Sequence, residues 1–268
     1  MGALTDSTIA ALRSNRDELA AMVKSFSASD LDRQSGSAKW DVAQVLSHLG
    51  SGAQIGLAGL QVALGAREPL AAEFNPSVWD RWNAMRQKEK AESFLVASEE
   101  LLQAYEALDA SVRDSLRFDL GFMPQPVDLA LVTGMRLNEA AMHAWDVRIA
   151  FDAQATIHGT VAEVLLDQFL GPIAFMLGFF GKPGAIEGQE INLHIETSNP
   201  TRNLELVVGD SISLTNDPDE TDGFLALPTE SLLRLISGRL APEHTPESVT
   251  ITGNVVDLDQ LRLVFPGY

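Results

Sequence analysis

The sequence of 268 residues contains no cysteine and few cations. Without cysteine there is no disulfide, thiolate metal ligand or cysteine nucleophile, so any metal must bind His, Asp or Glu. Lys and Arg total 19 against 37 Asp and Glu, which gives a formal net charge of −18. A surface this acidic repels phosphate groups, which argues against binding to nucleic acid or to an anionic membrane surface.

A long apolar run is also missing. The most apolar stretch, residues 171–180 (GPIAFMLGFF), is well short of the roughly 18 apolar residues that suggest a membrane span. The N-terminal stretch MGALTDSTIAALRSNRDEL lacks the basic start and apolar run of a signal peptide. With 46% hydrophobic and 21% charged residues, the composition is typical of a folded globular protein. These features predict a soluble cytoplasmic protein.

Hydrophobic periodicity divides the chain into two parts. Up to about residue 151, apolar residues recur at helical spacing, and the loops between the periodic stretches contain Gly, Pro and Ser. The expected long helices span approximately residues 4–23, 42–64, 77–108 and 127–151. Four long helices joined by short or medium loops are typical of a four-helix bundle.

After about residue 152, strand-like stretches occur together with helical ones. Helices are expected at residues 160–170, 229–237 and 258–264, and strands at 191–196, 204–208, 211–214 and 248–252. This mixture predicts a small α+β domain. The expected fold class is therefore α+β, with a helical bundle at residues 1–155 and a small α+β domain at residues 156–268.

The start of the second helix is well specified. Asp41 can cap this helix, and Gln44, three residues on, can complete a capping box. Trp40 and Val45 occupy the two positions of a hydrophobic staple. Trp40 is therefore expected to fix the entry of the chain into the helix.

Two of the five histidines, His48 and His143, lie on expected helices with apolar neighbours. Glu139 precedes His143 by four residues, about one helical turn, so both side chains share one face and can hold a divalent cation together. His48, on another helix of the bundle, can supply a third ligand. Two histidines and one glutamate form a recognised catalytic metal site with a position open to water or substrate. Spacing alone leaves a second interpretation open, a surface Glu–His pair without metal.

Asp146 allows two interpretations. It can orient His143, as carboxylates orient metal-bound imidazoles, or it can form an ion pair with Arg148 or Arg136. We slightly favour the structural ion pair. No chemical role is assigned to the remaining histidines, which have no partner at a suitable spacing: His158, His194 and His244.

Two segments resemble a known family. The stretches WDVAQVLSHL (residues 40–49) and RLNEAAMHAWDVRI (residues 136–149) are similar to the signature segments of the mycothiol-dependent maleylpyruvate isomerase family, part of the DinB-like superfamily of metal-binding four-helix bundles. The family pattern has a tryptophan eight residues before a histidine, and later a glutamate, a histidine four residues on, and Ala-Trp-Asp. The resemblance implies that His48, Glu139 and His143 bind a divalent metal, usually zinc, and that mycothiol is a thiol cosubstrate.

The second half resembles the smaller, sterol-carrier-like domain of the same family. The similarity covers the stretches LPTE, SGRL, LR and FPG, which begin at residues 227, 237, 261 and 265. In the family, an arginine of this domain faces the metal cleft and contributes to activity. Arg239 is our candidate for this arginine and for binding an anionic substrate or the thiol cofactor, with Arg262 as a fallback. Alternatively, the charge of Arg239 only stabilises a helix C-terminus.

From the resemblance we expect a metal-dependent enzyme with mycothiol as its nucleophile and a small electrophilic substrate. Zinc held by two neutral imidazoles and one carboxylate keeps a positive charge, which favours the deprotonated form of a thiol at its open position. Addition to an activated double bond, rotation and expulsion gives isomerisation, whereas displacement of a leaving group gives S-transfer. The sequence does not choose between the two reactions. The alternatives are a metal-dependent hydrolase of a small amide or ester and a non-enzymatic ligand carrier.

Overall fold

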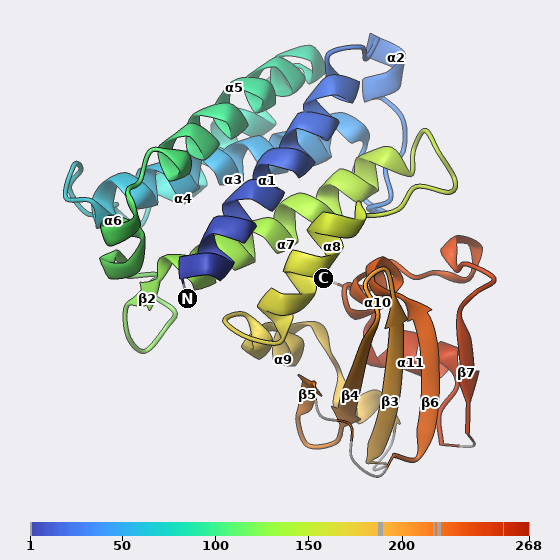
Figure 1. Ribbon diagram of the computed structural model, residues 1–268. Helices are drawn as coiled ribbons and strands as arrows, with labels where there is room; N and C mark the ends of the chain where they lie inside the picture. Colours follow the sequence, from blue (N-terminus) through green and yellow to red (C-terminus); the bar gives the residue numbers. More distant parts are fainter. Residues whose placement is uncertain (1, 187–189, 217, 219–220, 254, 268) are drawn as a thin grey trace. The chain divides into compact units, whose positions relative to one another are not determined.

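The computed structural model describes residues 2–186, 190–216, 218, 221–253 and 255–267. The chain divides into two compact units, Met1–Ala155 and Thr156–Tyr268. The first unit is mainly helical and includes a two-stranded ribbon, whereas the second combines helices with a five-stranded sheet (Figure 1). The expected α+β fold class is therefore confirmed.

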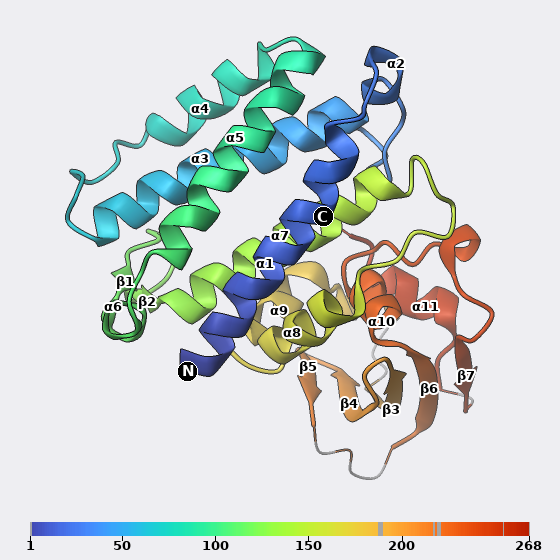
Figure 2. The same ribbon diagram turned by 45° about the horizontal axis from the view of Figure 1, so that its top comes forward.

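The first unit is built around four long helices, α1, α3, α5 and α7 (Figure 2). Its elements are α1 (Gly2–Val23), α2 (Ala28–Leu31), α3 (Val42–Ala63), α4 (Phe74–Asn83), α5 (Gln87–Glu106), α6 (Ala110–Ser115), β1 (Arg117–Phe118), β2 (Val127–Asp128) and α7 (Leu129–Arg148). Helix α3 packs along α5, α1 packs along α7, and α3 also contacts α7. The short strands β1 and β2 pair antiparallel just before α7 begins.

The core of the first unit follows the helical spacing of its apolar residues. Leu19 of α1, Leu46 and Leu49 of α3, and Phe94 of α5 are all 2% exposed or less. Burying each such side chain contributes roughly 1.5–3 kcal/mol, which holds the helices together although a single helix of this length is only marginally stable alone. The bundle packing therefore sets where side chains on different helices meet.

The capping box predicted for α3 is present. Asp41 Oδ1 accepts a hydrogen bond from the Gln44 N–H at 2.7 Å, and Gln44 Oε1 accepts one from the Asp41 N–H at 2.9 Å. Trp40 is partly buried against the core that contains Val45. These contacts fix the start of α3 at Val42, so that His48 lies in the second turn of this helix.

The single helix predicted at residues 77–108 was wrong. Helix α4 ends at Asn83, and α5 begins at Gln87 after a short turn. Arg86 has an extended backbone with ψ of 155°, and its N–H donates to Glu89 Oε2 at 2.9 Å, so a new helix N-terminus forms here. The apolar spacing continues across the turn, which contains neither Gly nor Pro, so periodicity alone did not reveal the break.

The second unit carries a five-stranded mixed sheet. Its elements are α8 (Gly159–Phe169), η1 (Ala174–Met176), α9 (Leu177–Phe180), η2 (Pro183–Ile186), β3 (Ile191–Ser198), β4 (Arg202–Val208), β5 (Ile212–Thr215), β6 (Gly223–Pro228), α10 (Thr229–Ile236), η3 (Pro242–His244), β7 (Thr250–Thr252) and α11 (Leu258–Val264). The strand order is β5-β4-β3-β6-β7, in which β3 and β6 are parallel and the other neighbours antiparallel.

Strand β6 was missed in the sequence analysis. Its sequence GFLALP contains a short apolar run without clear alternation, directly before the start of α10. Such a run fits a buried strand and a helix segment equally well. The parallel pairing with β3, a contact distant in sequence, decides the outcome.

No membrane-spanning segment is predicted from the sequence. Among the residues that the structure describes, no single helix combines the length and the apolar composition needed to cross a membrane. One bent pair of helices, Gly159–Phe169 with Ala174–Phe180, meets the length and composition criteria together, with an angle of 86° between its halves.

Candidate metal centre

The three predicted ligands meet between helices α3 and α7. His48 projects from α3, whereas Glu139 and His143 lie one turn apart on α7. One ring nitrogen of each histidine and one carboxylate oxygen all lie within 4.8 Å of one another. His48 Nε2 is 2.9 Å from Glu139 Oε2, and His143 Nε2 is 3.7 Å from the same oxygen. The structure thus brings all three residues to one place, and metal binding itself stays a prediction.

A divalent cation fits these atom positions. Zinc binds nitrogen and oxygen ligands at about 2.0–2.2 Å, so neighbouring ligands of a tetrahedral site lie about 3.4 Å apart. The two separations from the Glu139 oxygen, 2.9 and 3.7 Å, lie on either side of that value. The rings of His48 and His143 meet edge to face, with centroids 4.7 Å apart and planes at 72°. Small shifts of the side chains therefore suffice to coordinate one ion.

Asp146 lies behind His143 as seen from the other two ligands. Its Oδ2 is 2.7 Å from His143 Nδ1, and the side chain of Asp146 is fully buried. With the proton on Nδ1, the imidazole donates to this carboxylate and presents the lone pair of Nε2 toward Glu139. The contact with His143 supports the orienting role of Asp146 rather than the ion pair with Arg148 or Arg136 that the sequence favours.

The loop before α3 forms one wall of the centre. The Trp40 ring lies 5.0 Å from the His48 ring and 5.7 Å from the His143 ring, measured between centroids. Gly36 donates its N–H to the Asp146 backbone oxygen at 2.8 Å, and a Cβ at Gly36 would lie only 2.9 Å from Asp146 Oδ1. Trp40 therefore contacts both histidines, a role that the staple interpretation did not include.

The electrostatic surroundings keep Glu139 ionised. Burial by itself raises the pKa of Glu139, but the hydrogen bond with His48 and the electrostatic effects of His143, His48 and Arg136 outweigh it. Together they lower the pKa from 4.5 to about 2. His143 is buried, whereas His48 and Glu139 are partly exposed. The carboxylate is thus charged at neutral pH, which is the form that binds a cation.

The two candidate arginines of the second unit differ in their surroundings. Arg239 follows Gly238, whose φ of 71° ends α10, and its Nη1 donates to the Ser237 backbone oxygen at 3.0 Å. Arg262 of α11 donates from Nε to the Leu240 backbone oxygen at 2.8 Å and from Nη2 to a threonine hydroxyl at 2.7 Å. These contacts give Arg262 a structural role within the unit. A role of Arg239 in the chemistry stays a prediction.

The chain is similar to known proteins both in its sequence pattern and in its fold. Residues 12–148, just over half of the chain, match the family model described as the mycothiol maleylpyruvate isomerase N-terminal domain. A crystal structure of the mycothiol-dependent maleylpyruvate isomerase is similar, with a TM-score of 0.61 and 13% identity. The structure of a histidine-to-alanine mutant of that isomerase is similar too, with a TM-score of 0.62 and 12% identity. Each comparison covers 94% of this chain and 95% of the other, and no curated protein matches the chain.

The chain is thus a two-unit protein: a helical bundle in which two histidines and a glutamate converge in a way that suits a metal ion, followed by a unit with a mixed sheet. The chain belongs to the mycothiol maleylpyruvate isomerase family, a family of mycothiol-dependent isomerases. The resemblance inferred from residues 40–49 and 136–149 is therefore confirmed.

Proposed function

We propose that the protein is a metal-dependent enzyme that uses mycothiol to isomerise a small electrophilic substrate about a carbon–carbon double bond. The observation that carries the proposal is the convergence of His48, Glu139 and His143 within 4.8 Å, in a bundle that matches the mycothiol isomerase family. Isomerisation is preferred to S-transfer because the family is described by an isomerisation.

Each residue of the centre would have its own part in binding a cation, and Zn²⁺ is the ion that suits these ligands best. His48, Glu139 and His143 would supply its ligands, and the bound ion would act as a Lewis acid that favours the thiolate form of an incoming thiol. Asp146 keeps the proton of His143 on Nδ1, so that Nε2 is free to bind. The Trp40 ring covers one side of both imidazoles and restricts their rotation.

Arg239 completes the proposal as the residue that binds an anionic group of the substrate or of mycothiol. A guanidinium forms two parallel hydrogen bonds to a carboxylate, which a single ammonium does not. In a chain with a net charge of −18, a local cation is also needed to attract an anion. Support for this role comes from the family resemblance of the SGRL stretch that contains Arg239.

Metal analysis combined with a thiol-dependent assay tests the function. The purified protein is expected to hold one divalent ion per chain, and His48→Ala and Glu139→Gln are expected to lose it. Maleylpyruvate, the substrate named for the two similar structures, is then offered with and without mycothiol. We expect conversion only when both metal and mycothiol are present. Substrate decay without thiol would support a hydrolase instead, and wild-type protein that binds no metal would refute the proposal.

A further inference from the structure

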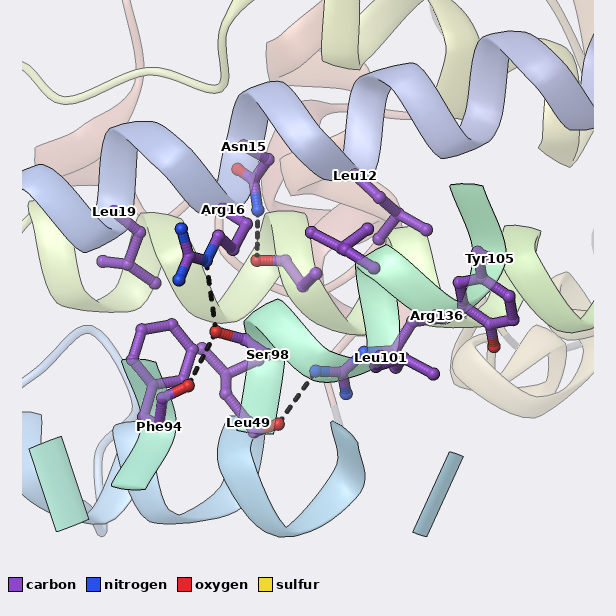
Figure 3. A pocket seen from close by; sticks show the side chains of 12 residues that line it. Leu12, Asn15, Arg16, Leu19, Leu49, Phe94, Ser98, Leu101, Tyr105 and Arg136 are labelled. Carbon is purple, nitrogen blue, oxygen red and sulfur yellow. Dashed lines mark hydrogen bonds between the residues drawn. The ribbon is translucent and has the colours of Figure 1, made fainter. Parts of the chain in front are cut away.

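Arg136 connects the two helices that carry the candidate metal ligands. It lies on α7, one turn before Glu139, and its Nη2 donates to the Leu49 backbone oxygen of α3 at 2.8 Å (Figure 3). Leu49 directly follows His48 in the chain. A single hydrogen bond therefore joins the helix of Glu139 and His143 to the residue next to the third ligand.

Helix α3 leaves room for this guanidinium. Gly52 lies three residues after Leu49, and a Cβ placed there would lie 2.9 Å from Arg136 Nη1. Any larger residue at position 52 would push the guanidinium away from α3 or move the two helices apart, because this distance is shorter than a normal contact. Arg136 and Gly52 thus fit each other at close range.

Arg136 lies among mainly apolar side chains, so filling space does not explain a charged residue at this position. The residue borders a bundle cavity of about 30 Å³, together with apolar side chains such as Leu12, Leu101 and Phe94 (Figure 3). A charged side chain costs desolvation free energy at such a place, which an apolar side chain of similar size would not. What the guanidinium adds is a directed hydrogen bond to one carbonyl and a positive charge on the same side of α7 as Glu139.

We propose that Arg136 is a positioning residue of the metal centre, which holds α3 and α7 in the register that brings His48 Nε2 to Glu139 Oε2. This inference rests on the proposed metal site. The two ligand atoms belong to different helices, so their 2.9 Å separation depends on how far one helix is shifted along the other. The bond to the Leu49 oxygen limits that shift within one residue of His48. A shift of about 1 Å is enough to misplace a ligand in such a site.

The test uses the full chain loaded with Co²⁺, whose visible absorption reports ligand geometry. Arg136→Met removes the hydrogen bond but keeps a long side chain. We expect a changed cobalt spectrum and an affinity lowered by about 10- to 100-fold, the range found when supporting contacts of metal ligands are lost. Arg136→Lys is expected to restore the spectrum only in part, because it lacks the planar fork of donors. Gly52→Ala, which displaces the guanidinium without deleting it, should change the spectrum in the same way.

The matched control is Arg16→Met. Arg16 of α1 donates to the Leu95 backbone oxygen of α5 at 2.8 Å, a comparable bridge between two helices that carry none of the three ligands. This variant should lose stability but keep the cobalt spectrum and affinity of the wild type. Circular dichroism checks that Arg136→Met and Gly52→Ala are folded. If both folded variants keep the cobalt spectrum and the cobalt affinity of the wild type, the positioning role is refuted while the metal site stands. If the wild type takes up no cobalt, both proposals fail.

Discussion

At the scale of single residues, the orientation of each imidazole decides what the centre can bind. His143 presents Nε2 toward Glu139 and Nδ1 toward Asp146. The four-residue spacing predicted that Glu139 and His143 share a helix face, but spacing alone does not tell which ring nitrogen points where. That assignment depends on the carboxylate of Asp146, three residues further along α7.

Asp146→Asn tests this assignment. The amide keeps the shape of the side chain but is a weaker acceptor for the Nδ1–H of His143, so the tautomer that exposes Nε2 loses its support. We expect the zinc affinity to fall by about 10- to 100-fold in competition with a chromophoric chelator. Asp17→Asn, an exposed carboxylate on α1, serves as the control and should leave the affinity unchanged. Equal affinities for the two variants would contradict the role given to Asp146.

At the scale of elements, helix α3 shows how glycine sets the distance between helices. Gly50 lies under the ring of Trp82 from α4, and a Cβ at Gly50 would lie 2.2 Å from Trp82 Cη2. Trp82 is held there by its Nε1–H, which donates to Gln54 Oε1 at 2.8 Å. Gly59, on the same helix, has no atom within 4 Å of an added Cβ. We therefore expect substitution by alanine to have opposite effects on stability at Gly50 and at Gly59.

Gly50→Ala should destabilise the protein by about 1–3 kcal/mol, because the added methyl group overpacks the contact with Trp82. Gly59→Ala should stabilise it by about 0.5–1 kcal/mol, because alanine has the better helix propensity and meets no obstacle. Urea unfolding followed by circular dichroism measures both changes. Equal destabilisation by the two substitutions would show that the contact of Gly50 with Trp82 does not cause the loss of stability.

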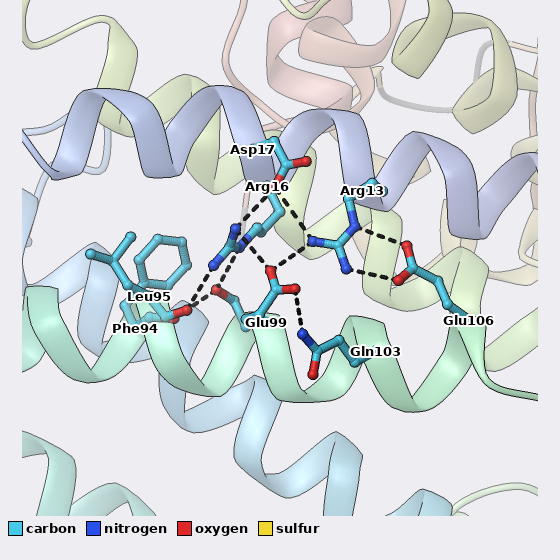
Figure 4. Close-up of polar contacts among 9 residues, drawn as sticks. Arg13, Arg16, Asp17, Phe94, Leu95, Glu99, Gln103 and Glu106 are labelled. Carbon is cyan, nitrogen blue, oxygen red and sulfur yellow. Dashed lines mark hydrogen bonds and ion pairs between the residues drawn. The ribbon is translucent and has the colours of Figure 1, made fainter.

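Helices α1 and α5 are also joined by charged side chains (Figure 4). Glu99 Oε2 lies 2.7 Å from Arg13 Nη1 and 2.9 Å from Arg16 Nη1, and Arg13 also meets Glu106 at 2.8 Å. The hydrogen bond from Arg13 lowers the pKa of Glu99 below its ordinary 4.5, although burial opposes this, and the charge of Arg16 adds to the lowering. Because the folded state binds this proton less well, Glu99 stabilises the fold above pH 4.5, and the contribution disappears as the pH falls through the lowered pKa.

Glu99→Gln should therefore lower the free energy of unfolding at pH 7 by a few tenths to about 1 kcal/mol, a range typical of partly exposed ion pairs. The difference from the wild type should shrink at pH values below the lowered pKa of Glu99, and also in 1 M salt as charges are screened. Glu92→Gln is the control, since Glu92 is exposed and its amine partner Lys88 lies 3.8 Å away. A difference for Glu99→Gln that is constant across the pH range would rule out the charge as its cause.

At the scale of the whole molecule, the candidate ligands belong to the first unit and the candidate substrate-binding arginine to the second. Variants of the two units can therefore test the proposed metal binding and the proposed substrate binding separately. A change in the second unit that reduces activity while the metal content and the melting temperature stay unchanged indicates a residue that contacts substrate or thiol. Arg239 and Arg262 form a natural pair for such a test.

Arg239→Ala should lower kcat/KM with maleylpyruvate and mycothiol by about ten- to hundredfold, the effect of losing one charge-assisted hydrogen bond worth about 1.5–3 kcal/mol. The metal content should stay at the wild-type level. Arg262→Ala should mainly lower the melting temperature, because it removes the bond to the Leu240 oxygen. Unchanged kinetics for Arg239→Ala would remove this residue from the proposed site.

The sequence alone determined the elements whose signals are local. The Asp41–Gln44 capping box, the shared face of Glu139 and His143, the two-part architecture and the family resemblance all depend on spacings within short stretches of chain. The break before α5 and the strand β6 were not predicted, because their determinants do not appear in the apolar pattern. These determinants are the Glu89 carboxylate that accepts from the Arg86 N–H and the pairing of β6 with β3.

Tertiary packing alone brings His48 to Glu139 and Arg136 to the Leu49 oxygen. Helix geometry determines the distance between residues one turn apart on a helix, so a sequence reveals it directly. The offset between two helices depends instead on how all their side chains pack, and on single contacts such as that of Gly50 with Trp82.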